Sequence, residues 1–349
     1  MIAVPLIVLL LIGLLIFRIA ANRETNEFDG MRFNEMLDHS LADQEGARIS
    51  MAVIKGETME FLVYGNNSEA QRMQLRDYEI GGLTKTLTAS LLCNAQEEGK
   101  LSLDDPIDQY LELKERPYYP SLRRIITHTA GYKDEYFAAP MLGNRIGGKN
   151  PLTGIDGESL QKRVGRIKLS EEDDGFLDSD FGIAVIGQVL ESIYGTPFPK
   201  LLEDYAAKDL GLAATRFTYS KADPKWQETD AYLAADGLTS NIEDMAKYLK
   251  QQMDGEPEEM AQAKRIQVHV DGNSKETAAL GIRIDAVTAG WMADFEKNII
   301  WYSGETENSH VFLGYDMESL YGVVILSSLT EERIPTTQMG AQKLKEMMA

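Results

Sequence analysis

The sequence contains almost no cysteine. Cys93 is the single cysteine among 349 residues, so the chain can form no internal disulfide and no zinc site made of several thiolates. Disulfide-stapled scaffolds and zinc fingers are therefore excluded. The four histidines, His39, His128, His269 and His310, show no paired spacing typical of metal sites. Cysteine and histidine thus predict no metal, and we expect no cofactor.

Positive charge is also scarce. The chain has 35 Lys and Arg against 55 Asp and Glu, which leaves a formal net charge of −20 at pH 7. The adjacent basic pairs Arg123-Arg124 and Lys162-Arg163 are short and lie among acidic residues. Because an acidic surface repels phosphate backbones, we expect no nucleic-acid partner. The remaining composition, 44% hydrophobic and 26% charged, is typical of a globular protein with a substantial core.

The first seventeen residues contain no charged side chain. Such a run is at the lower limit for a membrane span and close to the length of a signal-peptide core. We therefore expect residues 1–21 to be a membrane anchor or a signal segment, and residues 22–30 to be a polar linker. Arg18 and Arg23 follow the run and no basic residue precedes it, a bias that alone would retain the rest of the chain inside the cell. A basic leader ahead of this start would reverse the bias.

Residues 31–349 are expected to form one domain with strands at both ends and helices between them. The pattern predicts the α+β class: an antiparallel sheet built from the N- and C-terminal segments, flanked by helices, with an inserted, mainly helical subdomain at about 106–250. The expected strands cover 48–54, 59–64, 278–284, 286–292, 298–302, 310–315 and 321–327. The expected helices cover 33–41, 83–99 and 334–348.

Six short segments between residues 78 and 316 carry a family resemblance that we expect to extend over about residues 31 to 345. The first reads YEIGGLTKTLT at 78–88 and continues as EEGKLSLDDP at 97–106. In this order the segments resemble the serine β-lactamase and penicillin-binding-protein superfamily. They are most similar to its class C β-lactamase-like branch, which also holds esterases and D-amino-acid peptidases. The resemblance implies a β-lactamase/transpeptidase-like fold, in agreement with the predicted class. The other segments are RIITHTAGY (124–132), the stretch from Phe181-Gly182 to Gly195, DLGL (209–212), AADGLTS (234–240) and FLGYD (312–316).

Three motifs carry the chemistry that this resemblance implies. A serine three residues before a lysine attacks the acyl carbon, and the lysine, on the same helix face, accepts the proton. A Y-x-N or S-x-N motif relays protons. A K-T-G or H-x-G strand holds the substrate carboxylate and helps to form the oxyanion hole. The resemblance places these motifs on Gly82 and Lys85, on Asp178-Ser179-Asp180, and on Tyr302-Ser303-Gly304.

Glycine at position 82 removes the nucleophile of this chemistry, because it has no side-chain oxygen. Asp178 stands where tyrosine is expected, Asp180 where asparagine is expected, and Tyr302 where lysine or histidine is expected. Lys85 is retained, and a buried ammonium without a partner is costly. We therefore expect Asp178 or Asp180 to contact Lys85 and keep its proton bound. Lys85 would then be a structural or ligand-binding cation and no longer a base.

Several other side chains leave alternatives open. Thr84 and Ser179 could act as replacement nucleophiles, whereas Ser90 is more typical of a packed helix serine. The acidic run at 171–174, together with the two aspartates of the second motif, could bind Ca²⁺ or Mg²⁺, although it lacks the spacing of a calcium loop. Trp301 suits the wall of a cleft and a packed core equally well. His128 is more typical of a structural residue than of a catalytic one.

Three functions are consistent with these features. The first interpretation is a membrane-anchored, catalytically inactive protein on the extracytoplasmic face of a bacterial membrane, which binds a ligand or a partner protein in its cleft. By resemblance, its ligands would be peptidoglycan stem peptides, D-amino-acid peptides or related amides. The second is an active amide or ester hydrolase that uses Thr84, Ser179 or a metal-bound water. The third is a scaffold whose acidic surface binds a partner protein.

Overall fold

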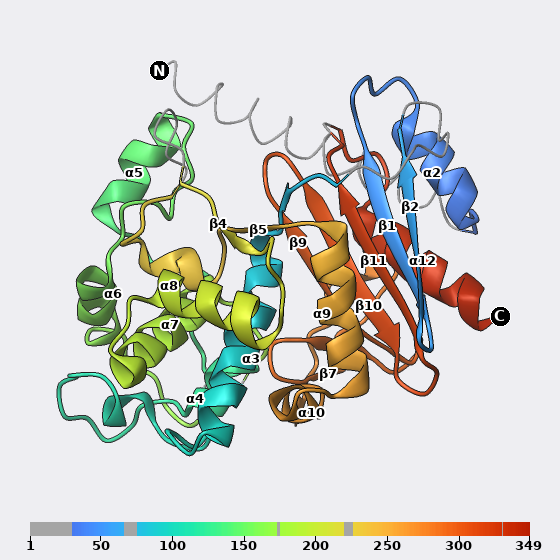
Figure 1. The fold of residues 1–349 in the computed structure, drawn as a ribbon. Coiled ribbons are helices and arrows are strands. Elements are labelled where there is room, and N and C mark those ends of the chain that lie inside the picture. Colours follow the sequence, from blue (N-terminus) through green and yellow to red (C-terminus); the bar gives the residue numbers. More distant parts are fainter. Residues whose placement is uncertain (1–29, 66–74, 173–174, 220–225, 330) are drawn as a thin grey trace.

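In the computed structural model, both ends of the chain contribute strands to one antiparallel sheet (Figure 1). Its eight strands lie in the order β2 (Thr58–Tyr64), β1 (Ile49–Lys55), β11 (Tyr321–Ser327), β10 (His310–Asp316), β9 (Ile299–Glu305), β8 (Met292–Asp294), β7 (Ala286–Val287) and β6 (Val268–His269). β1 pairs with β11 along its whole length, with Ile49 opposite Ser327 and Lys55 opposite Tyr321. The predicted α+β class, with a sheet made from both ends of the chain, is confirmed.

The structure describes residues 30–65, 75–172, 175–219, 226–329 and 331–349. The expected anchor or signal segment at 1–21 and the expected linker up to residue 29 lie outside these residues. Across the described part of the chain, no helix is long and apolar enough to cross a membrane.

Helices cover both faces of the large sheet. α12 (Thr336–Met348) packs on β10 and β11, and α2 (Phe33–Leu41) packs on α12. α9 (Ile242–Asp254) packs on the opposite face, against β1, β10 and β11 (Figure 1). β1, β10 and β11 are consequently buried along almost their whole length. Burial on both faces explains why these strands are nearly continuous apolar runs in the sequence.

α3 (Thr84–Glu97) lies between the sheet and the helical part of the molecule (Figure 1). It packs against α7 (Asp180–Tyr194) and α10 (Glu258–Ala263), and most of its residues are buried. A helix surrounded on all sides needs partners for its polar side chains. The Thr88 hydroxyl, for example, donates a hydrogen bond of 2.6 Å to the carbonyl oxygen of Ala234. Lys85, in the first turn, is therefore held by a helix that has little freedom to move.

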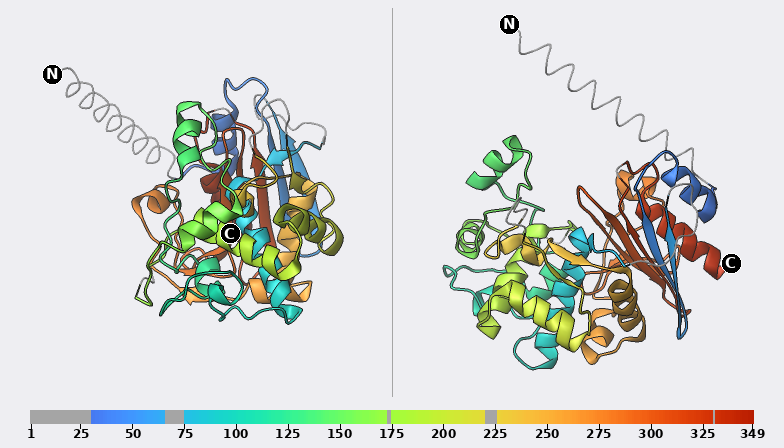
Figure 2. Two further views of the ribbon diagram at one scale, coloured as in Figure 1. Left: turned by 90° about the vertical axis from the view of Figure 1, so that its left-hand side faces the viewer. Right: turned by 45° about the horizontal axis from the view of Figure 1, so that its top comes forward.

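The helices between Leu122 and Asp204 form a helical subdomain beside the large sheet (Figure 2), whereas α9, which begins within the expected insertion at 106–250, packs on that sheet. The expected insertion also contributes to a three-stranded sheet that the sequence pattern does not predict, because strands of two or three residues leave no periodic signal. That sheet has the order β3 (Tyr78–Glu79), β5 (Leu238–Ser240) and β4 (Arg216–Phe217). Besides α7, the helices of the subdomain include α4 (Leu122–Ile126), α5 (Ala139–Ile146), α6 (Gly157–Val164) and α8 (Phe198–Asp204).

The strand expected at 278–284 is wrong. This segment instead contains the end of a short helix, α11 (Lys275–Ala279), and a turn. Ser274 and Thr277 explain the helix, because each side-chain oxygen accepts a hydrogen bond from the backbone N–H of the other residue. The turn that follows contains Gly281 with φ +66°.

The single strand expected at 286–292 is also wrong. The segment contains β7 and the first residue of β8, two strands separated by a turn at Gly290 with φ +77°. A Cβ atom at this glycine would lie 2.9 Å from Cβ of Ala89. The turn therefore packs tightly on α3, a tertiary contact that the apolar pattern of the segment conceals.

Gly304 brings β9 against the start of α3, and its replacement tests this close approach. A Cβ atom at position 304 would lie 2.1 Å from the carbonyl oxygen of Ile80 and 3.0 Å from the amide nitrogen of Leu83. We expect Gly304→Ala to lower the free energy of unfolding by about 2–3 kcal/mol, because backbone atoms must move apart. Denaturant titration measures the change. Gly175→Ala, whose Cβ meets nothing within 4 Å, is the control, and equal unfolding midpoints for the two variants would contradict the prediction.

Candidate functional site

The side chain of Lys85 is at the centre of the site. It begins in the first turn of α3 and is only 7% exposed. Its Nζ lies 2.7 Å from Oδ1 of Asp178 and 2.6 Å from Oδ1 of Asp180. The structure therefore places both carboxylates, from a segment more than ninety residues away, in contact with the retained lysine, as the charge-pair hypothesis requires.

Ser179 orients the two aspartates. Its backbone is extended, with φ −134° and ψ 105°, so the side chains on either side of it project in the same direction. Its hydroxyl donates to the carbonyl of Lys133 at 2.7 Å and accepts from the amide of Gly182 at 2.9 Å. The second contact caps the N-terminus of α7. Asp180 is the first residue of that helix, where the helix dipole favours a negative charge.

His128 contacts the segment that carries the two aspartates. It is a buried residue with a left-handed backbone, φ +57°. Its Nδ1 accepts a hydrogen bond of 3.1 Å from the amide of Ser179, and its Nε2 lies 3.6 Å from Oδ1 of Asp178. Burial lowers the pKa of this imidazole more than the attraction of Asp178 raises it. A neutral ring with its proton on Nε2 fits both contacts, which supports the predicted structural role.

The two aspartates keep the Lys85 ammonium charged. Burial alone would lower the pKa of its ammonium, but the attraction of Asp178 and Asp180 outweighs burial and raises that pKa well above its usual value. For Asp178, the opposing effect of burial is outweighed by the charge of Lys85 and by the hydrogen bonds from Lys85 and Tyr302, and its pKa falls to about 2. Burial dominates at Asp180, where Asp134 and Asp178 add repulsion, so that its pKa is raised. The raised pKa keeps the Lys85 ammonium protonated at neutral pH.

Position 82 faces Lys85 and has room for a side chain. A Cβ atom built on Gly82 would lie 3.6 Å from Cε and 3.9 Å from Nζ of Lys85, and 3.9 Å from the carbonyl oxygen of Ser303. These are ordinary van der Waals distances. Position 82 therefore has the space and the proximity to Lys85 that the serine motif implies, but no hydroxyl.

The candidate replacement nucleophiles are all buried and hydrogen-bonded. Oγ1 of Thr84 accepts from the amide of Leu238 at 3.4 Å, and Ser90 donates to the carbonyl of Leu87 at 2.9 Å. The Ser179 hydroxyl has both partners described above. Burial and these hydrogen bonds hold the three side chains in the packed part of the fold.

The third motif places its tyrosine in the site. The hydroxyl of Tyr302 donates to Oδ2 of Asp178 at 3.4 Å, and burial raises the pKa of this phenol, which therefore stays protonated. Ser303 contributes the carbonyl near position 82, and Gly304 allows the close approach of β9. Trp301 is 3% exposed and donates its indole N–H to the carbonyl of Arg283 at 3.2 Å. Of the two alternatives for Trp301, the structure thus supports packing.

Two acidic residues near the site were missed by sequence reasoning. Asp134 accepts a hydrogen bond of 3.1 Å from the backbone amide of Asp180 and so helps to fix the start of α7. Asp236 is partly exposed, and burial of its carboxyl group with repulsion from Asp180 raises its pKa to about 7, against the attraction of Lys85. Asp236 belongs to the AADGLTS segment, but nothing in that segment's own sequence indicates a neighbouring carboxylate.

The metal site considered for the acidic run cannot be described in full, because Asp173 and Asp174 lie outside the described residues. Among the residues that are described, no group of three or more His, Cys, Asp or Glu side chains could hold a metal ion.

A model of the β-lactamase family matches residues 33–339. The chain belongs to the β-lactamase family. The predicted superfamily is thereby confirmed. Over 345 aligned residues the chain is 19% identical to Protein flp of Staphylococcus aureus strain N315, an alignment that covers 90% of this chain and 66% of that protein. The chain thus spans just under two thirds of the length of this relative.

Solved structures share the fold of this β-lactamase family member. The β-lactamase/D-alanine carboxypeptidase from Yersinia pestis superimposes with a TM-score of 0.70 at 17% identity, covering 95% of this chain and 99% of that one. The D-amino acid amidase from Ochrobactrum anthropi SV3 gives a TM-score of 0.65 at 15% identity, with coverages of 90% and 99%. At these identities the likeness shows the fold alone.

Removing both carboxylates tests how Lys85 keeps its proton. In a variant with Asp178→Asn and Asp180→Asn, burial remains but the attraction is lost, so we expect the pKa of Lys85 to fall. Competitive acetylation between pH 7 and 11, read by peptide mass spectrometry, should label Lys85 at a lower pH in the variant than in the native protein. Lys345 in α12 serves as the internal reference. Identical pH dependence of Lys85 labelling in both proteins would rule out the carboxylates as the cause.

Proposed function

We propose that this protein is a non-catalytic member of the β-lactamase family that uses the cleft beside Lys85 to bind an amine-bearing peptide or amino-acid derivative. The observation that carries the proposal is the contact of the Lys85 ammonium with both Asp178 and Asp180 beside a glycine at the nucleophile position. Acyl transfer of the family's kind needs a hydroxyl and a base. Position 82 supplies no hydroxyl, and the lysine is held in its protonated form.

The replaced residues satisfy one another, which favours a rebuilt site over a damaged one. Lys85 has two acidic partners, and Asp178 also accepts a hydrogen bond from Tyr302. A buried ammonium left without these partners would strongly destabilise the fold. These contacts explain why residues of all three motifs changed together, and none of them needs a hydrolytic activity.

The charge of the site selects among the candidate ligands. Asp178 and Asp180 provide two carboxylates against one ammonium, and Asp236 adds a third acidic group nearby. A cleft with excess negative charge attracts a cationic group. Tyr302 also stands where the family's cation would hold a substrate carboxylate. We therefore favour D-amino-acid amides and peptides with a free amino group, including peptides derived from peptidoglycan. The names of two structural neighbours, a D-alanine carboxypeptidase and a D-amino acid amidase, support this class.

The proposal includes attachment to the membrane through residues 1–21 and placement of the domain on the extracytoplasmic face. The uncharged run at 1–17 supports attachment. A ligand derived from the cell wall would be present on that face, which is the reason for placing the domain there.

Covalent labelling tests the loss of catalysis. We expect no mass increase when the full-length protein in detergent is incubated with a β-lactam or an activated ester. Gly82→Ser alone should also stay unmodified, because the raised pKa of Lys85 leaves no base beside the new hydroxyl. Adding Asp178→Tyr and Asp180→Asn to Gly82→Ser should produce an adduct, once the lysine is released from its carboxylates. Intact-mass spectrometry reads the result, and circular dichroism confirms that each variant is folded. An adduct on the native chain would instead establish an active hydrolase.

Calorimetric titration tests the preference for an amine. D-alanyl-D-alanine amide, with a free ammonium, should bind saturably, and its N-acetylated form should bind at least tenfold more weakly. Asp178→Asn should weaken binding of the amine about tenfold, or about 1.4 kcal/mol. Asp38→Asn, an exposed aspartate on α2, removes the same charge far from the cleft and should have no effect. Equal affinity for the two peptides, or equal effects of the two variants, would refute an amine site at Asp178.

A further inference from the structure

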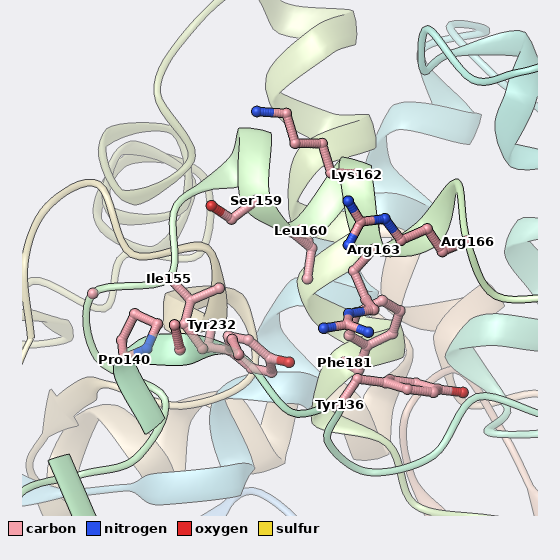
Figure 3. A pocket seen from close by; sticks show the side chains of 13 residues that line it. Tyr136, Pro140, Ile155, Ser159, Leu160, Lys162, Arg163, Arg166, Phe181 and Tyr232 are labelled. Carbon is pink, nitrogen blue, oxygen red and sulfur yellow. The ribbon is translucent and has the colours of Figure 1, made fainter. Parts of the chain in front are cut away.

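A separate pocket adjoins the N-terminus of α7. Its volume is about 250 Å³, and α6, the start of α5 and the segment around Tyr232 form its walls (Figure 3). Phe181, the residue after Asp180, lines it, but Lys85, Asp178 and Asp180 do not. The pocket therefore shares one helix end with the Lys85 site and has its own lining.

Aromatic rings form much of the wall. Phe181 packs edge-to-face against Tyr136, with ring centroids 4.7 Å apart, and Tyr232 completes the aromatic lining (Figure 3). Leu160 and Ile155 add aliphatic surface. Such a wall suits a flat or branched apolar group.

Two arginines without acidic partners supply the polar side of the pocket. Within the described part of the chain, the guanidinium of Arg166 forms no hydrogen bond or ion pair, and that of Arg163 donates only to the carbonyl of Phe137. Lys162, which also lines the pocket, is paired with Glu158 on α6. Both guanidinium groups therefore keep N–H donors that no described residue occupies.

We propose that this pocket binds a small carboxylate with an aromatic or branched apolar body, of the size of one acylated amino acid. Guanidinium groups recognise carboxylates through paired, charge-assisted hydrogen bonds. The three rings bury the apolar body, and a volume just below the usual range for small-molecule sites limits its size. The charge preference is opposite to that of the Lys85 site, so the two sites take different chemical groups. This inference does not depend on the proposed function.

Calorimetric titration of the full-length protein with N-acetylphenylalanine tests the pocket, with N-acetylphenylalanine amide as the uncharged probe. We expect saturable binding of the carboxylate and at least tenfold weaker binding of the amide. Arg163→Gln and Arg166→Gln should each weaken binding of the carboxylate tenfold or more. Lys168→Gln removes the same charge from an exposed neighbour that does not line the pocket, and should change affinity less than twofold. Asp178→Asn should also leave this affinity unchanged, which separates the pocket from the Lys85 site.

Three results would overturn the inference: no saturable binding, equal affinity for acid and amide, or native affinity in Arg166→Gln. The Arg166 variant keeps the test valid if Arg163→Gln disturbs the fold, because the Arg166 side chain is exposed and forms no hydrogen bond or ion pair with any described residue. Loss of binding in Asp178→Asn but not in the arginine variants would assign the carboxylate to the Lys85 site instead.

Discussion

The contact of Lys85 with Asp178 and Asp180 is the constraint on which the site depends. A buried ammonium is stable only when opposite charges and hydrogen bonds replace its hydration. Lys85 belongs to the central helix α3, and its partners belong to the segment that begins α7. One ionic cluster therefore joins the central helix to the helical subdomain. It also brings Tyr302 of the sheet into the same hydrogen-bonded network.

The two glycines of the altered motifs have different physical roles. Gly304 is required by packing, since any side chain there would collide with the backbone of Ile80. Gly82 has no such constraint, because a Cβ atom would meet only ordinary contacts. Packing therefore fixes the residue at position 304, whereas position 82 is sterically free to carry a side chain. The absence of a hydroxyl at position 82 is therefore not explained by a lack of space.

The surroundings of Lys85 and the arginine-lined pocket differ in the sign of their charge. Lys85 is surrounded by more carboxylates than cations, whereas the two arginines of the pocket between α5, α6 and α7 have no acidic partner among the described residues. The net charge of the whole chain, −20, does not indicate which charge prevails at either place. The start of α7 separates the two environments, with Asp180 on one side and Phe181 on the other.

The sequence alone was sufficient for the α+β class, the helix at Phe33–Leu41, the strands β1 and β2 and the identity of the family, because periodicity and short motifs are local properties. It also placed Gly82, Lys85 and Asp178 at one site through the order of the motifs. The strands wrongly expected at 278–284 and 286–292, and the small sheet, depended on caps, turns and contacts with α3. The protonation of Lys85 and the proximity of Asp236 were likewise decided by the fold, because burial and charge act through space between residues far apart in the chain.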